Sequence, residues 1–153
     1  MGSLNPDRAT EHEDAIVLGL DPGTDKCGLA VVSRLRGTLH QEVVSLAELP
    51  EIARRIAARF AIGEVAIGDC TGAERTHDQL ARAGIDVPVT AVSEELTSRL
   101  ARERYWEDNP PRGLARLIPL GLRVPPRPVD DYAALIIAER LLEQRGQRTA
   151  DLR

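Results

Sequence analysis

The stretch VLGLDPGTDKCGLAVV, from Val17 to Val32, decides the fold. Two apolar runs, over 15–20 and 28–33, lie on either side of a short turn. Short apolar runs bounded by turn residues are typical of buried strands, so we predict an antiparallel hairpin. Asp21 stands at the tip of the first strand. A carboxylate in that place can hold a metal ion beside a phosphodiester, or the backbone of the turn can cradle the phosphates of a nucleotide.

The remaining sequence predicts alternating strands and helices. A strand over 38–46 follows the hairpin, and strands over 64–69 and 87–93 each follow a segment with helical spacing of its apolar residues. The predicted helices cover 49 to about 63, 73–84, 94–108 and 129–145, and Gly146 is expected to stop the last one. Residues 110–128 hold six of the ten prolines, so we expect irregular structure with a short helix at 114–118.

These elements predict one α/β domain. Strands linked by short turns form an antiparallel meander, whereas strands that each follow a helix join in parallel by right-handed crossovers. We therefore expect a mixed five-stranded sheet, its first three strands antiparallel, with helices on both faces. The domain should cover residues 15–146, between a flexible acidic tail at 1–14 and a polar tail at 147–153.

Composition excludes some classes of protein and favours others. No apolar run approaches the roughly 20 residues that a membrane span needs, and the N-terminus lacks the apolar core of a signal peptide. Both observations predict a cytoplasmic protein with no membrane partner. The only cysteines, Cys27 and Cys70, form no Cys-x-x-Cys pair, which argues against a structural zinc site.

Positive charge is concentrated in one part of an otherwise acidic chain. The net charge is −4, yet residues 99–127 carry seven arginines against three acids. Arg99 and Arg102 follow Glu94 by one to two helical turns, and Lys26 is the only lysine. These three residues are candidates for phosphate contacts. The alternative is a solvated arginine-rich face. Tyr105 and Trp106 could stack on unpaired bases or cover an edge of the core.

Carboxylates recur where the predicted strands end. Asp21 ends the first strand, Asp69 the fourth, Glu94 follows the fifth, and Asp130 opens the last helix. The carboxyl ends of parallel strands share one edge of a sheet, so these side chains should converge. Clustered carboxylates repel one another, and Mg²⁺ or Mn²⁺ would relieve that repulsion. A pair of such ions can activate water and stabilise the leaving oxygen in phosphodiester hydrolysis.

Each acid also has a purely structural interpretation. Asp21 and Asp69 precede turn sequences, and Glu94 could favour a helix N-terminus through the helix dipole. Asp130 and its neighbour Asp131 could cap the last helix. Helical spacing does not choose between these two neighbours. Their joint position at converging elements is what favours a metal site.

Three segments resemble a known family. LGLDPGTDKCGLAVV resembles the first motif of RNase H-like resolvases of the YqgF/RuvX family. VSEELTS (92–98) is similar to that family's Val-Asp-Glu-Arg-Leu-Thr-Thr, and VDDYAALIIAERLL (129–142) to its closing helix. The resemblance covers about residues 15–145. It implies an RNase H-like fold and a nuclease that resolves Holliday junctions or matures 16S ribosomal RNA, acting as a dimer on junctions.

The resemblance also assigns roles. It puts Asp21, Glu94 and Asp130 on the acidic positions of the family's active site, and it favours Asp130 over Asp131. Two features depart from the family pattern. Ser93 stands where the family usually has Asp, and IGDCTGAERT (67–76) is more similar to the YqgF-like domain of the Tex transcription accessory protein. Asp69 occupies a strand end that carries an acid in RuvC resolvases, so it is a candidate fourth ligand.

The hypothesis is therefore a metal-dependent nuclease that acts on a DNA junction, single-stranded DNA or RNA. Asp21, Glu94, Asp130 and Asp69 would be its catalytic and metal-binding residues, and Lys26, Arg99 and Arg102 would contact nucleic acid. One alternative is an inactive RNase H-like module that only binds nucleic acid. An actin-like ATPase is a weaker alternative, because such proteins enclose their nucleotide between two domains and this chain supplies one.

Overall fold

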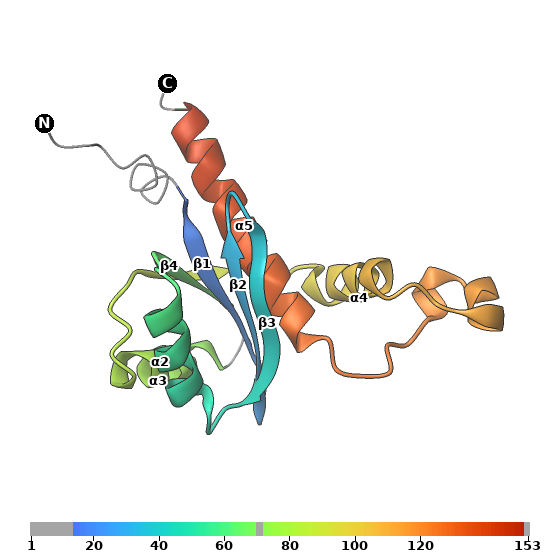
Figure 1. Ribbon diagram of the computed structural model, residues 1–153, viewed down its shortest axis with the longest axis horizontal. Helices are drawn as coiled ribbons and strands as arrows, with labels where there is room; N and C mark the ends of the chain where they lie inside the picture. The colour runs from blue at the N-terminus through green and yellow to red at the C-terminus, as the bar shows by residue number, and fades with distance from the viewer. Residues whose placement is uncertain (1–13, 70–71, 152–153) are drawn as a thin grey trace, which may run out of the picture.

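The computed structural model describes residues 14–69 and 72–151. Its centre is a five-stranded sheet with the strand order β3-β2-β1-β4-β5 (Figure 1). The strands are β1 (Ile16–Pro22), β2 (Lys26–Ser33), β3 (Gly37–Ser45), β4 (Glu64–Gly68) and β5 (Val89–Val92). β1, β2 and β3 pair antiparallel, whereas β4 pairs in parallel with both β1 and β5. The predicted mixed sheet is therefore confirmed.

Helices cover both faces of the sheet, as predicted. They are α2 (Leu49–Arg59), α3 (Ala73–Arg82), α4 (Thr97–Asp108) and α5 (Asp130–Asp151), with 3-10 turns at Gly113–Leu117 and Leu120–Leu122. Alternate residues along β1 point to opposite faces, so Leu18 packs under α2 and α3 while Val17 packs under α5. Figure 1 shows α2 and α3 on one side of the sheet.

Close backbone contact between α5 and the central strands holds the second layer in place. A side chain at Gly19 of β1 would collide with the carbonyl oxygen of Ala134, and its Cβ would lie 2.8 Å from that of Ala138. A side chain at Gly28 of β2 would collide with the backbone of Asp130. These two glycines let α5 lie directly on the sheet, so the helix crosses it at a fixed place.

Two predicted helix boundaries are wrong. The helix predicted over 94–108 begins only at Thr97, because Leu96 adopts a left-handed backbone conformation with φ 63°. The last helix does not stop at Gly146 but runs to Asp151. A glycine inside a helix costs about 1 kcal/mol, which a helix already nucleated by packing can bear. Gly84, by contrast, has φ +78° just beyond α3 and ends that helix as predicted.

The ends of the chain are only partly described. Residues 1–13 of the predicted acidic tail and residues 152–153 lie outside the described ranges, as does Cys70. Asp14, the last residue of that tail, accepts hydrogen bonds from the Ser33 hydroxyl at 2.6 Å and the Leu35 amide at 3.2 Å. Within the described residues, no helix combines the length and apolar character that crossing a bilayer would require.

The contact between α5 and β1 generates a prediction about stability. We expect Gly19→Ala to lower the free energy of unfolding by about 1–3 kcal/mol, because the new methyl group has to push α5 off the sheet. Urea denaturation measures this change. Gly121→Ala is the matched control, since its new methyl group would meet no atom within 4 Å. Equal stabilities of the two variants would show that α5 does not need the close approach.

Candidate functional site

Three separate elements bring Asp21, Glu94 and Asp130 to one edge of the sheet. Asp21 lies near the end of β1, Glu94 follows β5 by two residues, and Asp130 is the first residue of α5. Because β1, β4 and β5 run in parallel, the ends of β1 and β5 share this edge. Asp21 pairs with Gly28, the residue against which the Asp130 backbone packs. The absent side chain at Gly28 therefore brings the start of α5 to Asp21.

The electrostatics of Asp21 reflect this convergence. Burial, together with the negative charges of Glu94 and Asp130, raises the pKa of its carboxyl to about 7. An ordinary aspartate has a pKa near 3.8. Near neutral pH, Asp21 is therefore poised between its two protonation states. A cation that binds beside it would favour the ionised form.

Glu94 has an oxygen with no hydrogen-bond donor. Its Oε1 atom is buried, and within the described part of the chain it makes no hydrogen bond. Gly68 provides the space, because a side chain there would overlap the Glu94 carboxylate. A buried carboxylate oxygen without a donor is costly, so in proteins such an atom generally meets a cation or a proton.

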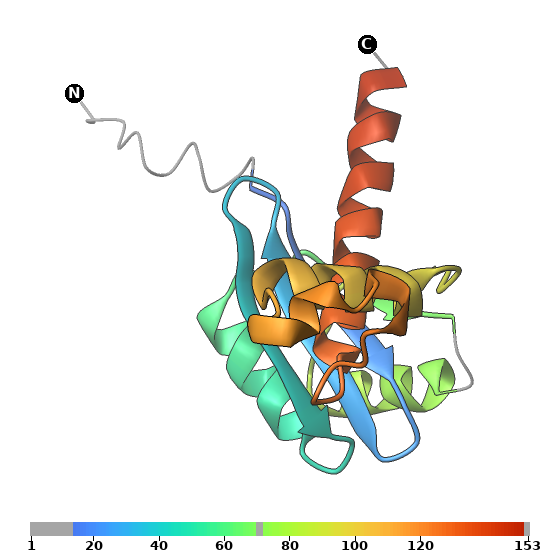
Figure 2. The same ribbon diagram turned by 90° about the vertical axis from the view of Figure 1, so that its right-hand side faces the viewer.

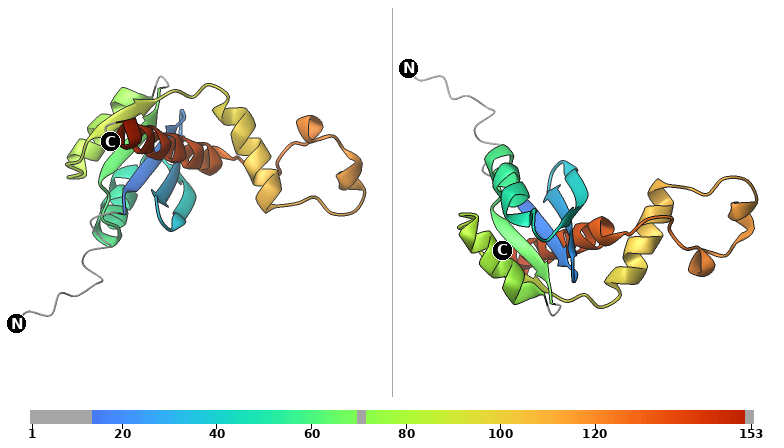
Figure 3. Two further views of the ribbon diagram at one scale, coloured as in Figure 1. Left: turned by 90° about the horizontal axis from the view of Figure 1, so that it is seen from above. Right: turned by 90° about the horizontal axis from the view of Figure 1, so that it is seen from below.

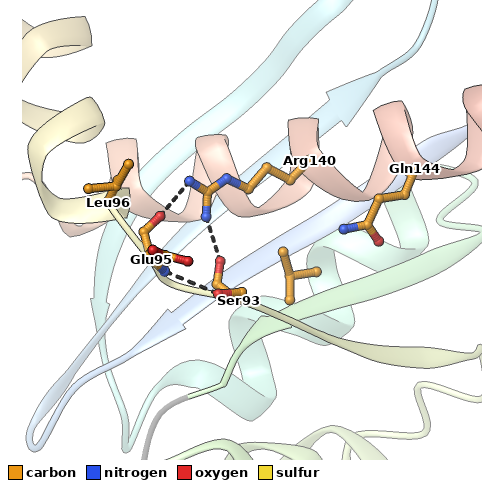
Figure 4. Close-up of a pocket in the computed structure, with 6 residues that line it drawn as sticks. Ser93, Glu95, Leu96, Arg140 and Gln144 are labelled. Carbon is orange, nitrogen blue, oxygen red and sulfur yellow. Dashed lines mark hydrogen bonds between the residues drawn. The ribbon is translucent and has the colours of Figure 1, made fainter.

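The loop that carries Glu94 is held on both sides. The Asp69 carboxylate accepts a hydrogen bond from the Glu94 amide at 3.0 Å. From α5, the Arg140 guanidinium donates to the carbonyl oxygens of Ser93 at 2.5 Å and Glu95 at 2.6 Å (Figure 4). It also donates to the Thr97 hydroxyl at 3.0 Å. These bonds fix the backbone immediately before and after Glu94, and they stabilise the turn that delays the start of α4.

Arg140 is the residue that sequence reasoning missed. In the sequence it is one arginine among many, and it lies at a polar position of a long amphipathic helix. Only the crossing of α5 over the end of β5 gives it a specific partner. Gly68 was missed for the same reason, since nothing in the sequence tells which side chain would need the space above it.

Asp130 and Asp131 have different environments. Asp131 is buried, and its carboxylate accepts hydrogen bonds from Arg127 at 2.9 Å and from Gln41 at 2.9 Å. The negative charge of Asp130 instead raises the pKa of Asp21. The structure therefore separates the two neighbours that helical spacing left equivalent: Asp130 lies with the other site carboxylates, and Asp131 forms a structural ion pair.

The donor set is one that a hard divalent cation would accept. Asp21, Glu94 and Asp130 offer only carboxylate oxygens, which Mg²⁺ and Mn²⁺ prefer, and their mutual repulsion would fall on binding. In residues 14–69 and 72–151, however, no three His, Cys, Asp or Glu side chains are already arranged around a common metal position. The chemistry of the residues fits the ion, but their side chains would have to turn toward it. Asp69 is exposed and already has one oxygen on the Glu94 amide.

The predicted phosphate-binding residues are exposed but do not form one cluster. Arg99 and Arg102 lie on α4 and line a groove with Leu120 and Arg123. Lys26 begins β2 and lines another groove with Arg127. The two aromatic residues take the structural alternative. Tyr105 is buried, Trp106 packs against the same core, and their rings meet edge to face at 5.0 Å.

Comparison with known proteins finds similar solved structures but no matching sequence family. No protein-family model and no curated protein sequence matches this chain. A structure of Thermus thermophilus RuvC in complex with a Holliday junction substrate is 26% identical over 81% of this chain and 90% of that chain, with a TM-score of 0.51. A second Thermus thermophilus RuvC structure is 22% identical over 80% of this chain and 90% of that chain, with a TM-score of 0.50. The sheet and its flanking helices match this RuvC, RNase H-like fold, as predicted.

The raised pKa of Asp21 generates a prediction about pH and stability. Folding raises this pKa from 3.8 to about 7, so the folded state binds the proton more tightly and loses stability as the pH rises through that interval. In metal-free buffer, Asp21→Asn should therefore raise the melting temperature at about pH 8.5 and raise it less at about pH 5. Asp25→Asn, on the exposed turn of the same hairpin, is the control. A gain of equal size at both pH values would contradict the clustering of charge.

The clamp on the Glu94 loop generates a second prediction. Hydrogen bonds from a charged donor contribute about 1.5–3 kcal/mol each, so Arg140→Ala should speed hydrogen exchange of the Glu94 amide about tenfold or more. Arg34→Ala is the control, because Arg34 donates to the Leu142 carbonyl oxygen at 3.1 Å, on the same helix but away from the loop. Amide exchange followed by NMR measures both variants. The same exchange rate in both would mean that Arg140 does not hold the loop.

Proposed function

We propose that this chain is a divalent-metal-dependent nuclease that hydrolyses phosphodiester bonds in branched nucleic acid. The observation that carries the proposal is the convergence of Asp21, Glu94 and Asp130 from three elements at one sheet edge. The oxygen of Glu94 without a donor and the raised pKa of Asp21 both describe a site with unbalanced negative charge.

The roles of the residues follow from their positions. The negative charges of both Glu94 and Asp130 raise the pKa of Asp21. Asp21 is therefore the residue best placed to contact a bound ion from the sheet. Glu94 and Asp130 add oxygens from β5 and α5, and Asp69 is a fourth candidate through its second oxygen. When bound, Mg²⁺ or Mn²⁺ would polarise the phosphodiester and lower the pKa of water. Arg140 and Asp69 keep Glu94 in place through its backbone.

Protonation of Asp21 would compete with metal binding. The carboxyl group has to lose its proton before it can ligate a cation. With a pKa of about 7 in the unloaded site, the affinity for Mn²⁺ would increase as the pH rises toward 8. This dependence belongs to Asp21 itself, so Asp21→Asn would remove it.

Branched DNA is the favoured substrate class. The RuvC structure that is 26% identical to this chain holds a Holliday junction substrate. The resemblance to the YqgF/RuvX family also allows maturation of ribosomal RNA, and a junction resolvase of this kind would act as a dimer. Lys26, Arg99 and Arg102 are exposed and remain our candidates for contacts to flanking phosphates.

Cleavage assays test this proposal. A four-way DNA junction, single-stranded DNA, single-stranded RNA and duplex DNA would each be incubated with Mg²⁺ or Mn²⁺, and we expect the junction to be cut fastest. Asp21→Asn should retain less than about one hundredth of the cleavage rate, since removing one electrostatic group from an active site costs about 10²–10³ in rate. Asp25→Asn should cleave like the unchanged chain.

Other results would point elsewhere. Preferred cleavage of RNA would move the substrate class to ribosomal RNA maturation. Binding of the junction without cleavage, together with no rise in melting temperature on addition of Mn²⁺, would identify an inactive binding module. Unchanged cleavage by Asp21→Asn would remove the carboxylate cluster from the reaction.

A further inference from the structure

The segment between α4 and α5 stands away from the rest of the molecule. We call residues 109–129 the arm; Figures 1 and 3 show it carried outward on α4, and Figure 2 shows it facing the viewer. No residue of the arm is buried. Its large apolar side chains face solvent, with Leu114 at 83% exposure, Leu117 at 79% and Val124 at 82%. A single exposed leucine needs no explanation, but a group of them on one projection marks an interaction surface.

Specific hydrogen bonds shape the arm. Arg123 donates to the carbonyl oxygens of Ile118 at 2.7 Å and Arg116 at 3.2 Å, which closes the tip upon itself. At its base, Arg127 forms an ion pair with Asp131 and lies 5.5 Å from the centre of the Tyr105 ring. The apolar side chains are therefore held outward by a built structure, although this costs contact with the core.

The charge of the arm favours an anionic partner. Residues 109–129 contain four arginines and no acidic residue, in a chain whose net charge is −4. Cationic side chains extend from both ends of the arm. Arg99 and Arg102 of α4 line a groove with Leu120 of the arm, and Lys26 lies in a groove with Arg127 at the base. Cationic side chains thus occur on α4, along the arm and at the hairpin of Asp21, and two of them are paired, Arg99 with Glu103 and Arg127 with Asp131.

Both ends of the arm connect to segments that carry a site carboxylate. At one end, α4 connects the arm to the loop of Glu94. At the other end, Val129 precedes Asp130, the first residue of α5. A molecule held by the arm therefore lies on the segment that joins two of the three site carboxylates. This continuity favours a polynucleotide, which can extend from the arm to the site, as the partner of the arm. A membrane surface is a less suitable partner.

We infer that the arm enters nucleic acid at a branch point, where its arginines bind backbone phosphates and its leucines pack against unstacked bases. The inference rests on the proposed function and specifies its substrate as nucleic acid with unpaired or separable bases. Apolar side chains inserted between base steps unstack them and bend the duplex. A four-way junction offers bases at its centre that are easier to unstack than those of a continuous duplex.

Fluorescence at the branch point tests this inference. The full chain, in EDTA to prevent cleavage, would be added to a four-way DNA junction with 2-aminopurine beside the branch. Unstacking raises the fluorescence of this base. The triple variant Leu114→Ser, Leu117→Ser, Leu122→Ser should lose most of that rise and bind about tenfold more weakly. Its melting temperature should not change, because the three side chains are between 73% and 83% exposed.

Two further variants separate the roles of charge and apolar surface. Arg112→Gln with Arg116→Gln should reduce the slope of log affinity against log salt by about 2, since each phosphate contact contributes about 0.9. This variant should keep the fluorescence rise at saturation, whereas the leucine variant should keep the salt slope. Leu35→Ser is the matched control, because Leu35 is 64% exposed on the turn between β2 and β3.

Each possible result has a distinct meaning. An undiminished fluorescence rise in the triple variant would overturn the inference, and so would leucine-dependent binding of phosphatidylglycerol vesicles without binding of the junction. A junction that is unstacked but not cut when Mn²⁺ is added would refute the proposed nuclease and leave the arm's role intact. A junction that is cut, but is unstacked equally by the unchanged chain and the triple variant, would support the proposed nuclease and refute the role of the arm. Absence of any binding would contradict both.

Discussion

The close approach of α5 to β1 and β2 is the contact on which the rest of the structure depends. Gly19 and Gly28 leave no side chain between the helix and the sheet. The helix therefore crosses at a fixed height and angle, with its first residue beside the end of β1. The same crossing brings Arg140 over the loop after β5. One backbone contact thus positions both Asp130 and the residue that holds Glu94.

Much of this arrangement could be predicted from sequence, because it depends on local patterns. The apolar runs around Asp21 indicated buried strands. Short turns between strands indicated antiparallel pairs, and helical connections indicated parallel pairs. Once β1, β4 and β5 were expected to be parallel, Asp21 and Glu94 had to share an edge. The acid at the start of α5 could be placed there only as a possibility. Its true position depends on how the helix crosses the sheet.

The predictions that failed concern competition between local and long-range interactions. Residues 94–96 have acceptable helical propensity, yet Asp69 and Arg140 take their backbone groups and Leu96 turns into the left-handed region. Gly146 is a good stop signal in isolation, but α5 continues through it. Gly28 gives no sign in the sequence of the neighbour it needs, and in the structure the backbone of Asp130 packs directly against it. In each case the partner is distant in sequence, so no local pattern reveals it.

The successive residues Asp130 and Asp131 couple the arm to the carboxylate cluster. Asp131 is buried, and Arg127 at the base of the arm is its cationic partner. If a load on the arm pulled Arg127 away, an unpaired buried carboxylate would remain next to Asp130, at a considerable cost in free energy. The base of the arm therefore resists displacement, and any strain that it transmits reaches the site through a single peptide bond. The residue that anchors the arm and a carboxylate of the site are therefore neighbours in the chain, so binding at the arm and the chemistry of the site are mechanically linked.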